Sequence, residues 1–229
     1  MKSTSSEDFW SNENKAREFA AREPDHRLRA LAAACREPGS TRVLDIGCAG
    51  GRNTVLLAEA GFDVRAIDFA EIMVRTTRAR LLPILGEEAA ADRVRKRRMS
   101  DLSDWDEATF DWILALGVYQ QAQSEDEWNA ALDETARVLK PEGLVLVANF
   151  GPGTGSRENP PALVPGSRFL YTGFHFGNSC HLTAKQLDDE FARRGFEVAE
   201  KTETVRKETE TGARETVNAL YRKSPSSSS

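Results

Sequence analysis

The sequence predicts an α/β protein built on a doubly wound, mostly parallel sheet. Short β-branched runs alternate with longer helical stretches over residues 41–150, and a glycine-rich segment follows the first of these runs. Strands that alternate with helices form a parallel sheet with helices on both faces. Ligands of such sheets bind outside the carboxyl ends of the strands. We therefore expect the chemistry in the loops that follow the strands.

Hydrophobic periodicity, caps and turn residues place the individual elements. Expected helices cover 53–60 and 71–82, one begins after a capping box of Ser124 and Glu127, and another begins after Thr183 and Gln186. Expected strands are 42–46, 63–67, 94–99, 110–115, 144–149, 196–204 and 215–221, with residues 140–143 as a turn. The last two strands look like a closing antiparallel pair.

Three zones divide the chain. Residues 1–40 are expected to form a polar tail and a helical cap, with helical spacing from Leu28 to Cys35. Residues 41–223 form the main domain, which contains an insertion at 151–182 that is rich in glycine, proline and aromatic residues. Residues 224–229, SPSSSS, have the composition of a disordered tail.

Composition narrows the function classes. The 229 residues carry a net charge of −5, so no global attraction draws the chain to nucleic acid or anionic lipid, and a small-molecule partner is favoured. Three scattered cysteines fit neither a disulfide framework nor a zinc spacing. The N-terminus has no apolar core of signal-peptide length, and the longest apolar stretch, 144–150, is too short to span a bilayer. We expect a cytoplasmic protein that does not enter membranes; the oligomeric state stays open.

The loop after the first strand reads DIGCAGGRN from Asp45 to Asn53. Glycines there allow close backbone approach to a ligand, and the next helix offers free N–H groups. A dinucleotide pattern started at Gly47 would need glycine where Ala49 and Arg52 stand. The Asp45 carboxylate would repel a pyrophosphate but favour the ammonium and sulfonium of S-adenosylmethionine. The loop therefore favours that cofactor.

The next two loops fit a nucleoside. Asp68 ends the second strand, where a carboxylate can accept both hydroxyls of a ribose. NAD-binding proteins place an acid here too, and a helix N-cap role for Asp68 is compatible with either ligand. After the third strand, Asp101 and Leu102 offer a polar group and a backbone N–H for an adenine edge.

The ordered segments VLDIGCAGGRNTVLLAEAGFDVRAIDFA, MSDLSD, FDWILALGVYQQ and ARVLKPEGLVLVANF resemble the successive motifs of class I S-adenosylmethionine-dependent methyltransferases. They are most similar to the small-molecule branch with G-R-N after the glycine loop, such as tellurite-resistance-type enzymes. The resemblance covers about residues 26–222 and implies seven strands, the last antiparallel.

The resemblance also assigns cofactor residues. Asp45, Gly47, Asp68, Asp101 and Leu116 correspond to the family's cofactor positions, and Cys48, Ala49, Asn53, Phe69, Met73 and Leu102 complete the expected site. Ala49 departs from the usual glycine and should tighten the approach to the methionine moiety. Gln120 and Gln121 stand where many relatives have histidine, so a histidine base is in doubt there.

Methyl transfer needs mainly in-line positioning and desolvation, because the sulfonium is already an activated leaving group. No catalytic triad is therefore expected. For the acceptor side we expect catalytic roles for Tyr119 and His175 and substrate contacts from Trp10, Gln120, Arg168 and Tyr171. The segment Phe9-Trp10 could close as a lid, although its rings and those of Phe174 and Phe176 could equally be core. No metal is expected, because His175, Cys180 and His181 lack a ligand spacing.

Alternatives remain open at this point. An NAD-dependent oxidoreductase would use a similar topology, and a catalytically silent module would bind the cofactor without turnover. The basic run 93–98 invites RNA methylation. Charges on a sheet edge also block aggregation, and the third strand is expected at an edge, so the edge interpretation is favoured.

Overall fold

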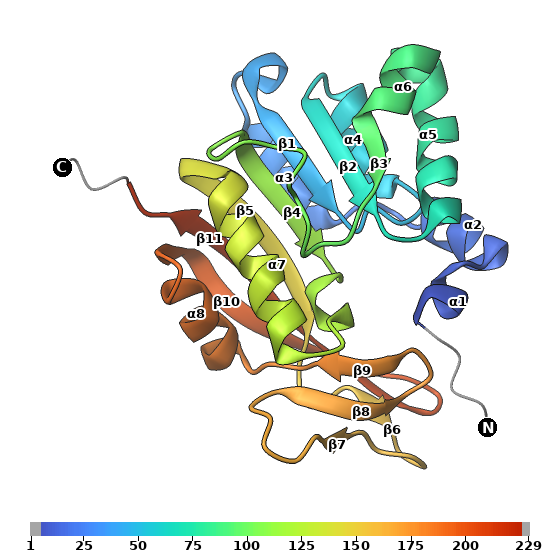
Figure 1. The fold of residues 1–229 in the computed structure, drawn as a ribbon, viewed down its shortest axis with the longest axis vertical. Coiled ribbons are helices and arrows are strands. Elements are labelled where there is room, and N and C mark those ends of the chain that lie inside the picture. The colour runs from blue at the N-terminus through green and yellow to red at the C-terminus, as the bar shows by residue number, and fades with distance from the viewer. Residues whose placement is uncertain (1–5, 226–229) are drawn as a thin grey trace.

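The structure, a computed structural model, describes residues 6–225 and leaves 1–5 and 226–229 outside the description. Its centre is a twisted sheet with the order β10–β11–β5–β4–β1–β2–β3 (Figure 1). The strands are β1 (Arg42–Ile46), β2 (Asp63–Asp68), β3 (Val94–Lys96), β4 (Phe110–Leu116), β5 (Leu139–Phe150), β10 (Phe196–Glu208) and β11 (Gly212–Lys223). Only β11 among these seven runs against the others, which confirms the doubly wound sheet with an antiparallel last strand.

Helices cover both faces of this sheet (Figure 1). They are α1 (Ser6–Trp10), α2 (Glu13–Ala21), α3 (His26–Ala34), α4 (Arg52–Glu59), α5 (Glu71–Leu85), α6 (Glu87–Arg93), α7 (Glu125–Val138) and α8 (Ala184–Ala192), with short turns η1 (Pro38–Ser40) and η2 (Tyr119–Gln121). Side chains of β1 alternate between the faces: Leu44 packs in the cluster with α7 and α8, and Val43 packs in the cluster with α3, α4 and α5. The two apolar layers on either side of the sheet are the core.

Several strand boundaries differ from the expected ones. β10 extends to Glu208 and β11 runs from Gly212 to Lys223, and the third and fifth strands differ as well. The third strand ends at Lys96, because Arg97 already turns to bond the carbonyl of Asp68. The segment expected as a turn at 140–143 belongs to β5 instead, and Glu142 takes a positive φ of 64° there. The register between β4 and β5 shifts at this point, so an irregularity in the ladder replaces the predicted turn.

The N-terminal helices reach the glycine loop. Asn12 caps α2 by accepting bonds from the backbone N–H groups of Asn14 and Lys15. A Cβ at Gly50 would lie 2.4 Å from the backbone nitrogen of Ala20, so only glycine allows α2 to pack this closely. Because residues 6–21 are polar in composition, α1 and α2 were not predicted, and a helix was expected only near α3.

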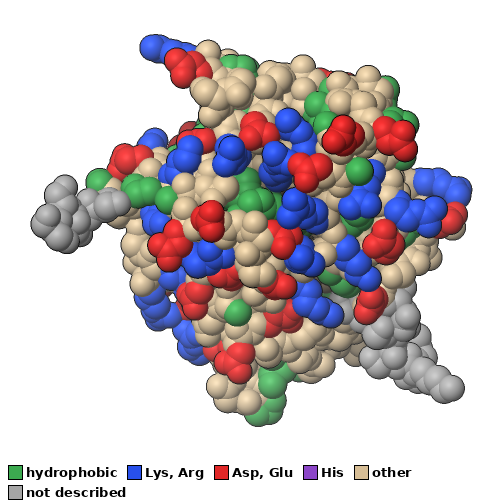
Figure 2. All heavy atoms as spheres, turned by 45° about the horizontal axis from the view of Figure 1, so that its top comes forward, with side chains coloured by type: hydrophobic (Ala, Val, Ile, Leu, Met, Phe, Trp, Pro, Cys, Tyr) green, Lys and Arg blue, Asp and Glu red, His purple; other side chains and the backbone are tan. Residues whose placement is uncertain are grey.

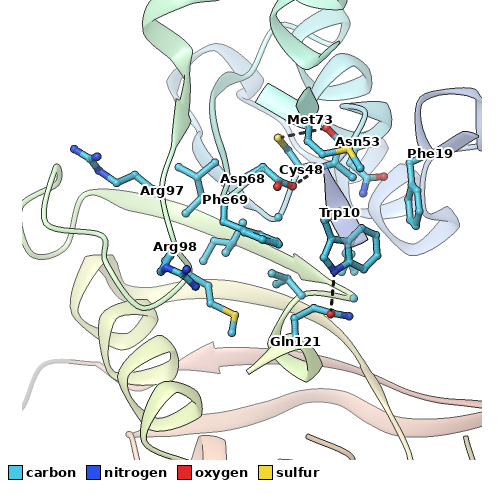
Figure 3. Close-up of a pocket in the computed structure, with 18 of the residues that line it drawn as sticks. Trp10, Phe19, Cys48, Asn53, Asp68, Phe69, Met73, Arg97, Arg98 and Gln121 are labelled. Atoms are coloured by element: carbon cyan, nitrogen blue, oxygen red, sulfur yellow. Dashed lines mark hydrogen bonds between the residues drawn. The ribbon is translucent and has the colours of Figure 1, made fainter. Parts of the chain in front are cut away.

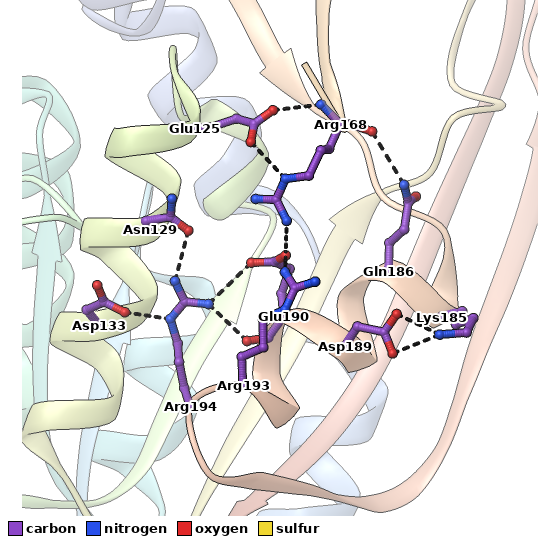
Figure 4. Close-up of polar contacts among 10 residues, drawn as sticks. All are labelled: Glu125, Asn129, Asp133, Arg168, Lys185, Gln186, Asp189, Glu190, Arg193 and Arg194. Carbon is purple, nitrogen blue, oxygen red and sulfur yellow. Dashed lines mark hydrogen bonds and ion pairs between the residues drawn. The ribbon is translucent and has the colours of Figure 1, made fainter. Parts of the chain in front are cut away.

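The insertion forms a second, three-stranded antiparallel sheet of β7 (Ala162–Leu163), β8 (Leu170–Phe174) and β9 (Gly177–Cys180), while β6 (Gly155–Ser156) pairs with β11. Arg168 ties it to the helices, because its guanidinium bonds Glu125 of α7 at 3.0 Å and Glu190 of α8 at 2.7 Å (Figure 4). Thr183 and Gln186 form the expected capping box at α8.

The expected disordered tail, 224–229, lies only partly within the description. The backbone N–H of Ser224 donates to the carbonyl of Gly195 at 2.8 Å, and residues 226–229 lie outside the described part. None of the helices between residues 6 and 225 combines the length and apolar character that crossing a membrane requires.

Candidate functional site

A cavity lies at the carboxyl ends of β1, β2 and β4, where the fold rule predicts a ligand (Figure 3). It encloses about 940 Å³, part of which is open to solvent. Its wall combines residues from the glycine loop, the strand ends, the N-terminal helices and η2: Trp10, Phe19, Ile46, Gly47, Cys48, Ala49, Arg52, Asn53, Ile67, Asp68, Phe69, Met73, Arg97, Arg98, Met99, Leu116, Gly117, Val118, Gln121, Gln123 and Glu127.

The glycine loop is held in one shape by its backbone. Gly47 and Gly51 have φ values of 71° and 78°, and Ala49 adopts a left-handed φ of 50° without being glycine. The carbonyl of Ala49 accepts a 2.8 Å bond from the Thr77 hydroxyl. A Cβ at Gly47 would come within 2.6 Å of the Val118 side chain, so the loop closes directly against the segment after β4.

Asp68 presents its carboxylate to this cavity. Its Oδ2 accepts a 3.0 Å bond from the Ala49 backbone N–H, and its Oδ1 accepts a 2.9 Å bond from that of Ala70. Burial raises its pKa to about 6, and no ion pair within residues 6–225 includes it. Each oxygen keeps acceptor capacity, so a ligand that donates hydrogen bonds complements it. Ala70, and not Asp68, is the N-cap of α5.

Asp45 lies beneath the loop and not in the cavity wall. It is 2% exposed, and its Oδ2 accepts a 2.6 Å bond from the Thr54 hydroxyl of α4. Burial raises its pKa to about 6. β1 points this side chain toward Thr54 of α4, so Asp45 does not line the cavity, and its role as a cofactor residue stays a prediction.

Arg52 gives the opposite end of the cavity a positive charge. It is the first residue of α4, whose N-terminus also offers unpaired N–H groups. Its guanidinium lies 5.9 Å from the centre of the Phe19 ring, and burial lowers its pKa. No acidic partner within the described residues forms an ion pair with it. The helix end and this side chain together suit a carboxylate.

Most other expected cofactor residues do line the cavity: Gly47, Cys48, Ala49, Asn53, Phe69, Met73 and Leu116. Asp101 and Leu102 do not. The Asp101 carboxylate is exposed and accepts a 2.6 Å bond from the Ser103 hydroxyl, while the Leu102 backbone N–H donates to Glu134 at 2.8 Å. Arg97, Arg98 and Met99, which the sequence analysis missed, line the cavity in their place. Because strand β3 ends earlier than predicted, the residues that line this part of the cavity stand earlier in the sequence than Asp101 and Leu102.

Both expected catalytic residues lie away from the cavity. Tyr119 is fully buried and donates a 2.6 Å bond to the Thr135 hydroxyl, because that hydroxyl spends its own hydrogen on the Ala131 carbonyl. His175 lies exposed at the turn between β8 and β9. The structure thus places both outside the cavity, because η2 turns Tyr119 into the core and the insertion carries His175 to the surface, and their catalytic roles stay predictions.

Of the expected substrate residues, only Trp10 lines the cavity. Its indole N–H donates a 3.2 Å bond to Gln121 across the mouth (Figure 3). Gln120 is buried and bonds the carbonyl of Gly117, Arg168 serves the ion-pair network, and Tyr171 stacks on His181. None of these three residues lines the cavity, and their expected substrate contacts stay predictions. Gln121 lines the cavity where Gln120 does not, because the helical turn after β4 decides which glutamine faces inward, and Gln123 and Glu127 were missed.

Comparison with known proteins agrees with this geometry. Residues 43–143, which span β1 to β5 with the glycine loop and Asp68, match the family model described as a methyltransferase domain. This stretch of the chain is therefore similar to a methyltransferase domain. The resemblance seen in the sequence motifs is confirmed.

Relatives of this methyltransferase domain act on different acceptors. The glycine/sarcosine N-methyltransferase of Aphanothece halophytica is 27% identical over 172 residues, which cover 71% of this chain and 57% of that protein. The ubiquinone biosynthesis O-methyltransferase of Maricaulis maris is 32% identical over 109 residues, covering 48% and 40%. The chain thus spans about half the length of these relatives.

The fold is shared with solved structures. The 1,6-didemethyltoxoflavin-N1-methyltransferase of Burkholderia thailandensis, solved with its acceptor and S-adenosylhomocysteine, superposes with a TM-score of 0.63. The two chains are 24% identical, and the alignment covers 95% of this chain and 81% of the other. This likeness confirms the fold.

Proposed function

We propose that this protein transfers the methyl group of S-adenosylmethionine to a nitrogen, oxygen or sulfur atom of a small molecule. The observation that carries the proposal is Asp68, a buried carboxylate that faces the cavity with backbone donors and no cation. Such a group requires hydrogen-bond donors from a ligand, and two ribose hydroxyls supply them.

The cavity fits the rest of that cofactor. Arg52 and the N-terminus of α4 would hold the carboxylate of the methionine moiety. The apolar side chains of Ile67, Phe69 and Met99 line the part of the wall beyond Asp68 and would enclose the adenine ring. Gly117 and Val118, after β4, would lie near the sulfonium between these two ends. When bound, the cofactor supplies an electrophilic methyl group.

The protein itself contributes by positioning the reacting groups and by excluding water from them. Trp10 and Gln121 join the N-terminal helix to η2 across the cavity mouth, and thereby keep bulk water from the reacting atoms. Among residues 6–225, the carboxylates in the cavity wall are those of Asp68 and Glu127, and each accepts from backbone N–H: Asp68 from Ala49 and Ala70, Glu127 from Gln123. An acceptor that arrives with a free lone pair therefore suits this site best.

Two observations bear on the alternatives. The basic run is neutralised by carboxylates: Asp104 accepts from Arg95 and Arg97 at 3.1 and 2.7 Å, and Asp63 pairs with Arg93 at 2.9 Å. Acidic and basic side chains are interspersed on the face in Figure 2, which favours a small acceptor over nucleic acid. β3 is the sheet edge, as the edge interpretation requires.

Ligand-induced stabilisation tests the cofactor. S-adenosylhomocysteine at 100 times its Kd should raise the free energy of unfolding by about 2.7 kcal/mol, whereas NADH should leave the melting temperature unchanged. Stabilisation by NADH alone would overturn the proposal. The acceptor is then sought by following S-adenosylhomocysteine release with amines, thiols, phenols, carboxylates and heterocycles, a screen in which a silent binding module would release none.

A further inference from the structure

One edge of the central sheet has a long strand without an outer neighbour. Strand β10 lies last in the sheet order and, within residues 6–225, pairs only with β11 (Figure 1). Every residue of β10 after Phe196 is exposed except Thr202, which is half-buried. The outer N–H and C=O groups of this strand therefore face solvent, and such groups are a template for pairing with another strand.

Only one half of β10 is regular. Two irregularities interrupt its ladder with β11, one between Val198 and Glu200 and one between Glu200 and Glu203. From Glu203 to Glu208 each residue stands opposite one residue of β11 without a shift. Bulges hinder the pairing of a further strand. Residues 203–208, which we call the pairing segment, therefore offer the straight part of this edge.

Three side chains of the pairing segment share one face of the sheet: Glu203, Val205 and Lys207. Val205 is 50% exposed. The ion pairs that this segment makes within residues 6–225 belong to Arg206 and Glu208, on the other face. Four residues of a strand span about 13 Å, so Glu203 and Lys207 cannot neutralise each other within one chain.

Lys207 also has an unfavourable neighbour. It stands directly opposite Arg214 of β11, and like charges at opposite positions of an antiparallel pair repel each other. The Arg214 guanidinium lies 5.3 Å from the centre of the Phe150 ring and forms no ion pair in the part of the chain that the structure describes. The edge at Lys207 therefore lacks negative charge, and a carboxylate on its outer side would be stabilising.

We propose that the pairing segment binds the same segment of a second copy of this chain, as two antiparallel strands related by a two-fold axis at Val205. This register places Glu203 of each copy opposite Lys207 of the other, and Val205 opposite itself. Two ion pairs form, two exposed valines contact each other, and the unpaired backbone groups of both edges gain partners. The pairing uses the same edge of both copies, so association stops at a dimer. The inference does not depend on the proposed methyl transfer.

The opposite edge of the sheet lacks these features. β3 is only three residues long. A two-fold axis at its central residue would place Arg95 opposite itself, and Asp92 and Asp104 already bind this guanidinium. Like charges on an edge block pairing. The same rule permits pairing at β10, because charges of opposite sign meet there.

Disulfide formation tests the two-fold axis. Opposite residues of an antiparallel pair have Cα atoms about 4.5–5.5 Å apart, a separation that a disulfide bridges. Val205→Cys should therefore form a covalent dimer under mild oxidation with oxidised glutathione. Val198→Cys is the matched control, because Val198 is 47% exposed on the same strand but lies outside the pairing segment. Neither this control nor the wild-type protein should become covalently linked.

Charge reversal tests the register, with the dimer Kd of the full chain measured by sedimentation equilibrium. Glu203→Lys would place like charges opposite each other at two symmetric positions, so the dimer Kd should rise about tenfold or more. The double variant Glu203→Lys/Lys207→Glu exchanges both charges and should restore the wild-type Kd. Glu200→Lys makes the same charge change outside the pairing segment and should leave the Kd unchanged.

Lys207→Glu separates association from folding. It places a carboxylate opposite Arg214, so the monomer should keep its stability in urea denaturation while the dimer weakens. A wild-type protein that stays monomeric at every concentration would overturn the inference. A dimer that Glu203→Lys leaves intact would overturn it too, as would equal covalent linkage of Val198→Cys and Val205→Cys, or a double variant that associates as weakly as Glu203→Lys.

Discussion

The backbone N–H of Ala49 donates a 3.0 Å hydrogen bond to Oδ2 of Asp68, so the loop after β1 orients the carboxylate that ends β2. This bond requires Ala49 to keep a φ of 50°, which an L-residue other than glycine adopts at a cost. The strained residue Ala49 therefore orients the carboxylate of the proposed ribose site.

Replacing Ala49 by glycine should relieve that strain. We expect Ala49→Gly to raise the free energy of unfolding by about 0.5–1 kcal/mol, because glycine tolerates positive φ and the gain exceeds its larger unfolded-state entropy. Urea denaturation measures the change. Ala108→Gly, also at positive φ (52°), should behave alike, whereas Ala60→Gly, at φ −80°, should destabilise. A loss of stability in Ala49→Gly would show that the loop is not strained.

Asp68 should dominate cofactor affinity. Asp68→Ala removes a charged acceptor worth about 1.5–3 kcal/mol, so the Kd for S-adenosylhomocysteine should rise tenfold or more. Asp106→Ala, at an exposed carboxylate at the opposite end of the sheet, is the control and should leave calorimetric affinity unchanged. Unaltered affinity in Asp68→Ala would mean that the ribose lies elsewhere.

Affinity should depend on pH through the same carboxylate. The pKa of Asp68 is raised to about 6 by burial, so below pH 6 the group takes up a proton and loses acceptor capacity. We expect S-adenosylhomocysteine to bind about five- to tenfold more weakly at pH 5 than at pH 7.5. Titrations across this range check it, and Asp68→Asn should flatten the profile.

The stability of the free protein should respond to this group in the opposite direction. A carboxyl whose pKa is higher in the folded state than in the unfolded chain stabilises the fold at low pH, and this contribution disappears as pH rises through about 6. Asp45, with its pKa also raised to about 6, adds to the effect. Relative to Asp68→Asn, wild-type protein should therefore lose stability between pH 4 and 7. A rise over that interval would contradict the assigned burial.

Variants of Tyr119 and Trp10 should distinguish a structural side chain from one that acts at the site. Tyr119→Phe removes the bond to Thr135 and should cost about 1 kcal/mol of stability, while the Kd for S-adenosylhomocysteine and turnover stay unchanged.

Trp10→Phe keeps an aromatic ring but breaks the bond to Gln121, so we expect a several-fold rise in that Kd with little change in stability. Calorimetry measures the Kd for S-adenosylhomocysteine and urea denaturation measures stability, so the two methods together distinguish Trp10→Phe from Tyr119→Phe. A loss of turnover in Tyr119→Phe at full stability would restore its predicted catalytic role.

The order and type of the main elements were predictable because local patterns determine them. The run from Val43 to Ile46, the capping box at Thr183 and the glycines after β1 each follow from near neighbours in sequence. The place of Asp68 in the cavity wall was predictable for the same reason, since a parallel strand delivers its last side chain to the sheet edge.

Which side chains face the cavity was decided by tertiary structure. One helical turn after β4 buries Tyr119 and Gln120 and presents Gln121, and no local pattern distinguishes these neighbours. Helix α2 is held because Ala16 packs against Met73 of α5 and Gly50 admits its backbone, and Trp10 of α1 packs on the same cluster, so these contacts join distant parts of the chain. The sequence alone determined the fold and the cofactor class. Long-range packing decided the mouth of the site, because the free energy that orders those residues comes from contacts between segments and not from the segments themselves.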